Sequence, residues 1–259
     1  MAPAPASAET SVNSQHTAGR DRGSPVLEAH GLCKEYGPVV AVDGVDLALE
    51  EGEFLTVFGP NGAGKSSLLG MLGGAMRPTR GEVRVRGDAM TFSEVEWRHH
   101  IGMLSHQGFL YSRLTAAENL RFYGRLFDLP DLDSLIQERL ERVGLTNRAG
   151  FEVRQLSHGM RQRLSLARAL LHDPDVVLLD EPYTGLDPSA AGVLRDVLGE
   201  LRDGRRTVVM VTHNLREGVD MATRIAIQVS GRFAWEGARS EIDGDTFERH
   251  YHAVVERRA

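Results

Sequence analysis

The chain has 259 residues, of which 41% are hydrophobic and 25% are charged, so a wholly disordered or fibrous protein is excluded. The 30 Lys and Arg residues against 36 Asp and Glu residues give a formal charge of −6, which argues against broad nucleic-acid binding because such binding needs a basic face. Cys33 is the only cysteine, which excludes a disulfide within the chain and a multi-cysteine metal site.

The N-terminal end of the chain differs in composition from the rest. Residues 1–24 are rich in Ala, Pro, Ser and Thr and predict a disordered tail, without the basic and apolar regions of a secretory signal. We expect the main domain over residues 25–240 and a C-terminal extension over 241–259. No apolar run approaches the roughly 18 residues of a membrane-spanning helix, so work at a membrane would need another chain to supply the span.

Strand patterns dominate the first hundred residues. Val45–Leu49 alternates between apolar and polar residues, which is typical of a half-buried strand. Phe54–Phe58 is mostly apolar and runs directly into a glycine-rich loop. After this loop we expect a helix from Lys65 to about Met76, ended by Pro78. Two further strands are predicted, over Gly81–Gly87 at a sheet edge and over Ile101–Ser105.

Helical spacing predominates from Thr115 to about Arg142, where Leu120, Tyr123 and Phe127 share one face. The elements predicted after it are a helix over Met160–Leu171, a strand over Val176–Leu179, a helix through Leu194, Val197 and Leu201, a strand over Thr207–Val211, a helix over Leu215–Ala222, and a hairpin of Ile225–Val229 and Arg232–Trp235. Apolar strands that alternate with helices indicate an α/β fold with a mainly parallel, helix-covered sheet.

The sequence GPNGAGKSS matches the phosphate-loop pattern G-x-x-x-x-G-K-[ST]. Its glycines allow a tight turn that points backbone N–H groups at phosphate oxygens, and the following helix adds the positive end of its dipole. Lys65 can reach the β- and γ-phosphates, and the Ser66 hydroxyl can ligate Mg²⁺. The predicted nucleotide-binding residues are Gly59, Pro60, Asn61, Gly62, Ala63, Gly64, Lys65, Ser66 and Ser67. The loop predicts a P-loop NTPase core but leaves kinases, GTPases and transport ATPases open.

A second motif, a pair of acidic residues, follows the strand at Val176–Leu179. Asp180 and Glu181 project from the C-terminal end of that strand, where ligands bind in parallel sheets. Asp180 is suited to hold Mg²⁺ either directly or from its outer shell, and Glu181 is placed to polarise an attacking water.

These motifs and the block LSHGMRQRLSLARALLHDPDVVLLDEPYTGLDPS resemble the ABC-type ATPases over about residues 26–237. The resemblance implies an N-terminal antiparallel β subdomain and a helical subdomain at about 109–160 beside the P-loop core. It also implies roles for four further residues. Tyr36 would stack on adenine, and Gln107 would be the Q-loop glutamine, which takes part in catalysis and in metal binding. Asp187 would be the D-loop aspartate and His213 the switch histidine, a catalytic residue.

The signature motif departs from the family's usual LSGGQ. His158 replaces a glycine and Met160 replaces the glutamine, whereas Ser157 and Gly159 remain. In the family the serine hydroxyl and the glycine N–H contact the γ-phosphate across a dimer interface, so the two main donors are kept. The contact made by the glutamine is lost.

The resemblance implies an ATP-binding and ATP-hydrolysing subunit of an ABC transporter that uses ATP and Mg²⁺. Its implied partners are a separate transmembrane permease and a second ATP-binding subunit, either another copy or a paralogue, with no nucleic acid. Its implied location is the cytoplasmic face of the cell membrane. Phe109, Leu110 and Tyr111 either form a groove for a helix of the permease or pack the helical subdomain.

The sequence leaves alternatives to this function open. The segments around Gln107 and Ser157 are similar to ATP subunits of haem exporters for cytochrome c biogenesis, and also to drug- and lipid-exporter subunits. A non-transport ABC ATPase that acts on ribosomes or DNA is the alternative outside transport. A P-loop kinase or GTPase is disfavoured by the LSHGM helix.

Overall fold

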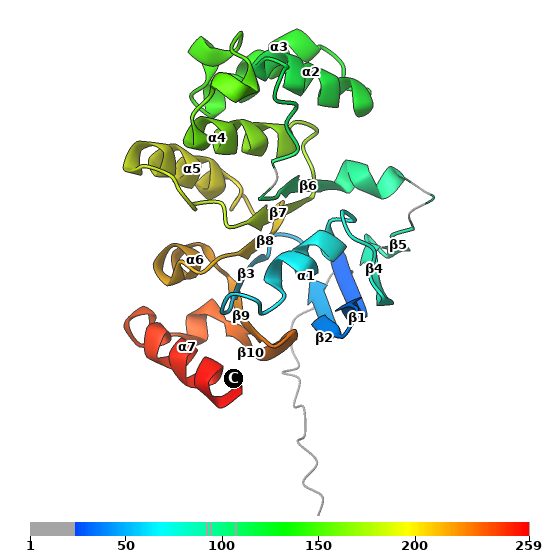
Figure 1. Ribbon diagram of the computed structural model, residues 1–259, viewed down its shortest axis with the longest axis vertical. Coiled ribbons are helices and arrows are strands. Elements are labelled where there is room, and N and C mark those ends of the chain that lie inside the picture. The colour runs from blue at the N-terminus through cyan, green and yellow to red at the C-terminus, as the bar shows by residue number, and fades with distance from the viewer. Residues whose placement is uncertain (1–23, 92, 94, 107, 259) are drawn as a thin grey trace, which may run out of the picture.

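The structure is a computed structural model that describes residues 24–91, 93, 95–106 and 108–258. Within these residues the strands form a six-stranded and a four-stranded sheet (Figure 1). Residues 1–23 of the predicted tail and Gln107 of the predicted site lie outside the described residues.

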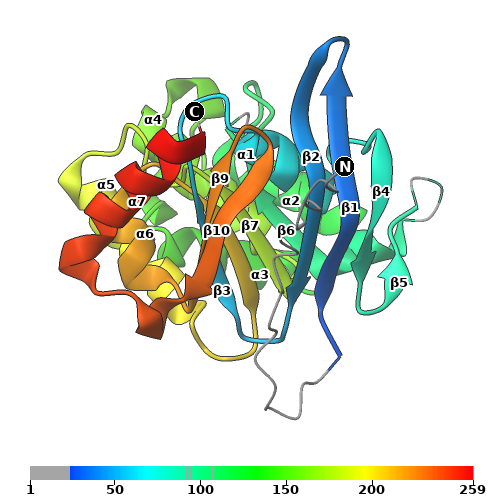
Figure 2. The ribbon, with the colours of Figure 1, turned by 90° about the horizontal axis from the view of Figure 1, so that it is seen from below.

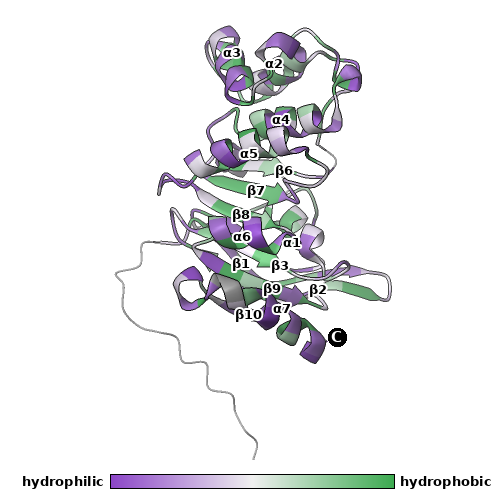
Figure 3. Ribbon diagram, turned by 90° about the vertical axis from the view of Figure 1, so that its left-hand side faces the viewer, coloured by the Kyte–Doolittle hydropathy of each residue, from purple (hydrophilic) through white to green (hydrophobic). Residues whose placement is uncertain are grey.

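The six-stranded sheet has the order β10-β9-β3-β8-β7-β6. Its strands are β3 (Phe54–Phe58), β6 (Ile101–Leu104), β7 (Val176–Asp180), β8 (Thr207–Val211), β9 (Arg224–Val229) and β10 (Arg232–Ala238). All neighbours are parallel except β9 and β10, which form the predicted hairpin. Every residue of β3, β7 and β8 is buried, and all of them except Thr56, Asp180 and Thr207 are apolar, as expected where helices cover both faces of a parallel sheet (Figure 3). The predicted mainly parallel sheet is confirmed.

The four-stranded sheet is antiparallel and has the order β2-β1-β4-β5. It contains β1 (Leu27–Tyr36), β2 (Val39–Leu49), β4 (Arg80–Val85) and β5 (Asp88–Ala89), and Figure 2 shows β1 and β2 as a long hairpin. The prediction of an edge strand at Gly81–Gly87 is wrong, because β4 pairs with β1 on one side and with β5 on the other. A tight turn at Arg86 and Gly87, both with positive φ, returns the chain into β5.

The helices are α1 (Lys65–Leu72), α2 (Ala116–Leu126), α3 (Leu132–Arg142), α4 (His158–Ala169), α5 (Pro188–Glu200), α6 (Leu215–Met221) and α7 (Gly244–Arg258), with short 3-10 turns at Glu96–His100, Thr146–Arg148, Val153–Gln155 and Arg239–Glu241. The helices from α1 to α6 lie close to their predicted positions, whereas α7 falls in the predicted C-terminal extension. Helix α1 ends four residues before the predicted Met76. The reason is Gly74, which has a φ of +63° and packs so tightly that a Cβ there would lie 2.1 Å from the Trp97 ring.

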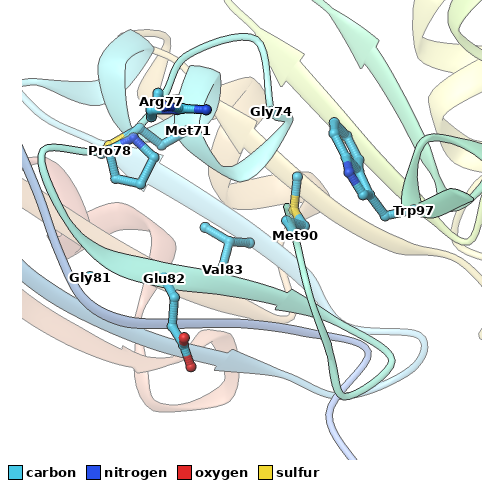
Figure 4. Close-up of a pocket in the computed structure, with 9 residues that line it drawn as sticks. All are labelled: Met71, Gly74, Arg77, Pro78, Gly81, Glu82, Val83, Met90 and Trp97. Atoms are coloured by element: carbon cyan, nitrogen blue, oxygen red, sulfur yellow. The ribbon is translucent and has the colours of Figure 1, made fainter. Parts of the chain in front are cut away.

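A cavity of about 250 Å³ lies beneath this helix end, between α1 and β4 (Figure 4). Met71, Val83, Met90 and Trp97 supply most of its apolar wall. None of the predicted site residues lines it. The cavity is therefore separate from the phosphate loop.

Helix α7 was not predicted from the sequence. Phe247 is 1% exposed and packs against Phe58 with ring centroids 5.2 Å apart. Tyr251, Val254 and Val255 add to the same small core beside β9 and β10. The spacing i, i+4, i+7 and i+8 from Phe247 is the signal that would have found this helix.

The helical region is not separated from the sheet by a gap in the core. One apolar cluster runs from Phe54 and Val208 in the sheet through Leu164 of α4 to Leu120 of α2 and Ile136 of α3. A second cluster joins the opposite face of the sheet to α1 and to the antiparallel sheet. Figure 1 shows α2 and α3 stacked beyond α4 and α5, far from α7.

His172, just after α4, gives the fold a predicted pH dependence. Its ring stacks on Phe127 of the α2 end at 3.9 Å, and its Nε2 lies 3.1 Å from the Ile101 carbonyl oxygen. Burial lowers the pKa of His172 from 6.5 to about 4. Between these two values the unfolded chain binds a proton that the folded chain does not, so the free energy of unfolding decreases as the pH falls through this range.

We expect this group alone to remove about 2 kcal/mol of stability between pH 7.5 and pH 5. Denaturant unfolding at both pH values measures the change. His172→Gln keeps an amide donor for Ile101 but cannot titrate, so it should lose about that much of the pH dependence. Equal pH dependence of the free energy of unfolding in the parent and the variant would show that His172 is not the group responsible.

Candidate active site

The phosphate loop lies between the end of β3 at Phe58 and the start of α1 at Lys65. Its backbone is crowded by two neighbouring strands. A Cβ on Gly64, where φ is +96°, would lie 1.9 Å from the Ala41 carbonyl oxygen of β2, and a Cβ on Gly59 would lie 2.2 Å from the Gln228 carbonyl oxygen of β9. Glycine is therefore required at both positions, and the loop is held in a fixed shape.

Lys65 is buried at the base of this loop. Its ammonium group donates hydrogen bonds to the carbonyl oxygens of Gly59, at 2.7 Å, and Pro60, at 3.0 Å. Burial lowers the pKa of Lys65, while the charges of Glu181 and Asp180 act in the opposite direction. The structure thus brings the loop cation close to the two predicted carboxylates.

The carboxylates themselves lie at the end of β7. Asp180 is 6% exposed, and its Oδ1 accepts a hydrogen bond from the Ser66 hydroxyl at 3.1 Å. Burial is the main cause that raises the pKa of Asp180, with a further contribution from Glu181. A buried carboxylate that is costly to ionise is a place where a cation would be stabilising.

Glu181 and His213 meet because β7 and β8 are parallel neighbours, with Asp180 opposite Val211. Glu181 Oε2 lies 2.8 Å from His213 Nδ1 and 3.3 Å from the His213 backbone N–H. Glu181 has a φ of +48°, a conformation that is rare outside glycine, and its backbone N–H donates to the Val211 carbonyl oxygen at 2.9 Å. This unusual backbone is typical of a functional position.

Two residues of this region were not predicted. Thr212 is 1% exposed, and its hydroxyl donates to Glu181 Oε2 at 3.2 Å while accepting from the Asn214 N–H at 3.1 Å. Its position directly before His213 in the sequence is the signal that could have identified it. Gln228 of β9 is fully buried beneath the loop, and neither of its amide atoms has a hydrogen-bond partner among the described residues. No sequence pattern singled it out.

Tyr36 lies at the end of β1, beside the start of α1. Its hydroxyl donates to Met76 Sδ at 2.9 Å and lies 3.5 Å from Ser67 Oγ. The Lys34 ammonium lies 5.3 Å from its ring centroid, and the side chain is 46% exposed. An anchored but exposed ring next to the phosphate loop is suited to stacking on a base.

The signature residues lie elsewhere, at the start of α4. Ser157 caps this helix, because its hydroxyl accepts from the Met160 N–H at 3.2 Å. Asp187 caps α5 in the same way, accepting from the Ala190 N–H at 2.8 Å. Gly159 packs against the start of α5, since a Cβ on it would lie 3.3 Å from Ala190 Cβ. Within the described residues, neither Ser157 nor Asp187 hydrogen-bonds to the phosphate loop.

The family model for the ABC transporter matches residues 42–184, more than half of the chain. The chain belongs to the ABC transporter family. This ABC cassette is 35% identical over 223 residues to Nod factor export ATP-binding protein I of Ralstonia nicotianae, covering 85% of this chain and 69% of that protein. It is 38% identical over 222 residues to daunorubicin resistance ATP-binding protein DrrA3 of Streptomyces coeruleorubidus, covering 85% and 70%.

A solved structure supports the same assignment. The cassette matches a dimeric ATP-binding cassette in a post-hydrolysis state, bound to ADP and Pi, with a TM-score of 0.76 and 29% identity over 82% of this chain and 98% of that one. The chain is therefore an ABC ATPase, the ATP-binding and ATP-hydrolysing subunit of an ABC transporter. Within the described ranges, no helix combines the length and the hydropathy that a membrane span requires.

Proposed function

We propose that two cassettes pack head to tail, with each ATP between the phosphate loop of one chain and the signature motif of the other. The observation that carries this proposal is the division of the motifs within one chain. Lys65, Asp180, Glu181 and His213 gather at one edge of the sheet, whereas Ser157 and His158 are exposed at the start of α4. A single chain leaves its ATP site without the signature donors, and a second chain would supply them.

In this arrangement each predicted residue has a chemical task. Lys65 and the loop N–H groups stabilise the phosphate charge, and Tyr36 stacks on adenine. Glu181 polarises the attacking water, and His213 with Thr212 holds its carboxylate in place. Ser157 and Gly159 donate to the γ-phosphate of the opposite site. Asp187 lies at the same interface.

Asp180 at the end of β7 and Ser66 in the first turn of α1 fit a Mg²⁺ ion. Ser66 and Asp180 offer hard oxygen atoms 3.1 Å apart, and burial already raises the pKa of the Asp180 carboxyl. We propose that Ser66, Asp180 and Gln107 hold the ion, either directly or through water. When bound, Mg²⁺ neutralises phosphate charge.

Ser157→Arg tests the dimer. We expect it to block ATP hydrolysis while ATP binding to the isolated chain stays nearly intact, because the added cation collides with the incoming loop only in the closed dimer. Calorimetry measures binding, and phosphate release with the membrane partner present measures turnover.

Ser157→Asn separates the two roles of this residue, since asparagine retains helix capping but lacks the hydroxyl. We expect the asparagine variant to fold like the parent and to hydrolyse ATP more slowly. Hydrolysis by Ser157→Arg at the parent rate would show that Ser157 only caps α4.

We propose that an aromatic patch on the helical region binds the permease. The patch consists of Phe109, Tyr111, Phe122 and Leu126, each between 37% and 61% exposed. The rings of Tyr111 and Phe122 meet edge to face at 4.8 Å. Leu110, in contrast, packs into the core, so this segment contributes to both surface and core. Exposed aromatic and apolar side chains suit a short helix of the transmembrane chain.

Phe122→Glu should abolish co-purification with the transmembrane chain, because the patch would gain a charge that the interface would have to desolvate. ATP affinity of the free subunit should not change. Val95→Glu places the same charge on another exposed apolar residue and serves as the control. Equal recovery of the permease with both variants would contradict the proposed surface.

The names of the two relatives describe Nod factor export and daunorubicin resistance, and we propose that this chain also energises export from the cytoplasmic face of the cell membrane. Haem export stays a prediction. Cytochrome c content in cells that lack the chain distinguishes the two: unchanged content supports another exported compound, and lost content supports haem.

A further inference from the structure

The departure of the signature motif from LSGGQ has a structural counterpart. His158 stands where the family has glycine, and its Nε2 lies 3.1 Å from the Thr184 carbonyl oxygen. The ring also lies over Gly185, where φ is +72° and a Cβ would come within 3.1 Å of the imidazole. A glycine at position 158 could make neither contact.

A second side chain of α4 joins the same segment. Gln162, one turn further along the helix, donates from Nε2 to the Pro182 carbonyl oxygen at 3.2 Å. Gly159 closes the gap between the two helices by packing against Ala190 and Leu186. Figure 1 shows α4 and α5 side by side, so the start of α4 and the 182–190 segment form one packed unit.

This segment begins at the proposed hydrolytic residue. The Thr184 N–H donates to the Glu181 carbonyl oxygen at 3.1 Å, and the Thr184 carbonyl oxygen lies 3.1 Å from His158 Nε2. The backbone of Glu181 is therefore linked to the signature motif through one residue and two hydrogen bonds. The φ of +48° at Glu181 fixes where this turn starts.

We infer that His158 is a positioning residue that ties the signature motif of a chain to that chain's own Glu181 turn. This inference rests on the head-to-tail dimer proposed above. In that dimer the signature motif serves the partner's ATP, whereas Glu181 serves the chain's own ATP. The His158–Thr184 contact therefore couples the two ATP sites. When the Glu181 turn of one chain shifts, the signature donors that this chain offers to the other ATP site shift with it.

A direct contact between His158 and the partner's nucleotide would be a different role. Its imidazole N–H is already directed at the Thr184 carbonyl oxygen, and Gly185 lies against the same edge of the ring. The geometry favours a link within the chain. The two roles differ in cooperativity, since a nucleotide contact would change the apparent affinity for ATP and leave the coupling between sites intact.

The test compares His158→Ala with His158→Gln in the full chain with its membrane partner. Alanine removes the contact without adding the flexibility of glycine, and the glutamine amide can place a donor close to the position of Nε2. We expect His158→Ala to lower kcat roughly three- to tenfold and to reduce the Hill coefficient for ATP toward 1, with KM nearly unchanged. His158→Gln should restore most of both.

The Glu181→Gln chain separates this inference from the proposal on which it rests. Monomers of the Glu181→Gln chain in gel filtration with ATP would contradict the dimer and the coupling together. If the Glu181→Gln chain does form ATP-bound dimers, a His158→Ala variant that carries the native Glu181 and keeps the parent kcat and Hill coefficient would overturn the coupling alone. So would a rise in KM at constant Hill coefficient, which is the result expected of a nucleotide contact. An unchanged melting temperature of the free chain shows that the alanine variant folds.

Discussion

Glu181→Gln should reduce ATP turnover roughly 100-fold or more while leaving ATP binding intact. The amide has the shape of the carboxylate and can still accept from Thr212 and His213, which donate to Glu181 Oε2 in the parent. It carries no charge with which to polarise a water molecule. The backbone turn at Glu181 makes the same demand on both residues, because φ is +48° in either case. Phosphate release under saturating ATP measures the loss.

The same variant should also accumulate as an ATP-bound dimer, since hydrolysis is the step expected to reopen the head-to-tail dimer. Gel filtration with and without ATP detects this. Glu200→Gln is a matched control, because it removes a carboxylate that pairs with Arg142 on the exposed end of α5. Turnover by Glu181→Gln equal to that of Glu200→Gln would show that another group activates the water.

The site could be predicted from sequence to the extent that it follows from the order of strands and motifs. Phe58 precedes the loop, Asp180 ends β7 and His213 follows β8, so a parallel sheet necessarily brings these ends to one edge. Short apolar runs located β3, β7 and β8 well, because strands that are buried on both faces do not alternate between apolar and polar residues.

The parts that were missed depend on contacts between distant segments. Trp97 packs against Gly74, two residues beyond the end of α1, and no local signal in Lys65–Met76 reveals that contact. Helix α7 is stabilised by Phe247 against Phe58, which lies almost two hundred residues earlier in the chain. Thr212 acquires its role only when β7 and β8 pair, and the contact of His158 exists only because α4 and α5 pack side by side. Local patterns cannot encode such partners.

Lys65→Ala should weaken ATP binding roughly 10- to 100-fold, because it removes the cation that the phosphate loop holds at its base. The ammonium donates to the carbonyl oxygens of Gly59 and Pro60, so it lies against the loop that is expected to hold the β- and γ-phosphates. Lys65→Arg should also bind poorly, since only 8% of the Lys65 residue surface is exposed and the site cannot take the larger guanidinium without displacing its neighbours. Calorimetric titration with Mg-ATP measures both variants.

A loss of binding is informative only if the loop still folds, because Lys65→Ala leaves two loop carbonyl groups without this donor. Arg84→Ala is the control for lost charge, since Arg84 pairs with Glu82 on the exposed face of β4, away from the loop. We expect its ATP affinity to equal that of the parent. If Lys65→Ala keeps the melting temperature of Arg84→Ala but loses ATP, the defect lies in phosphate recognition. If it keeps the parent affinity, the ammonium makes no net contribution to the phosphates and the loop binds them through its backbone alone.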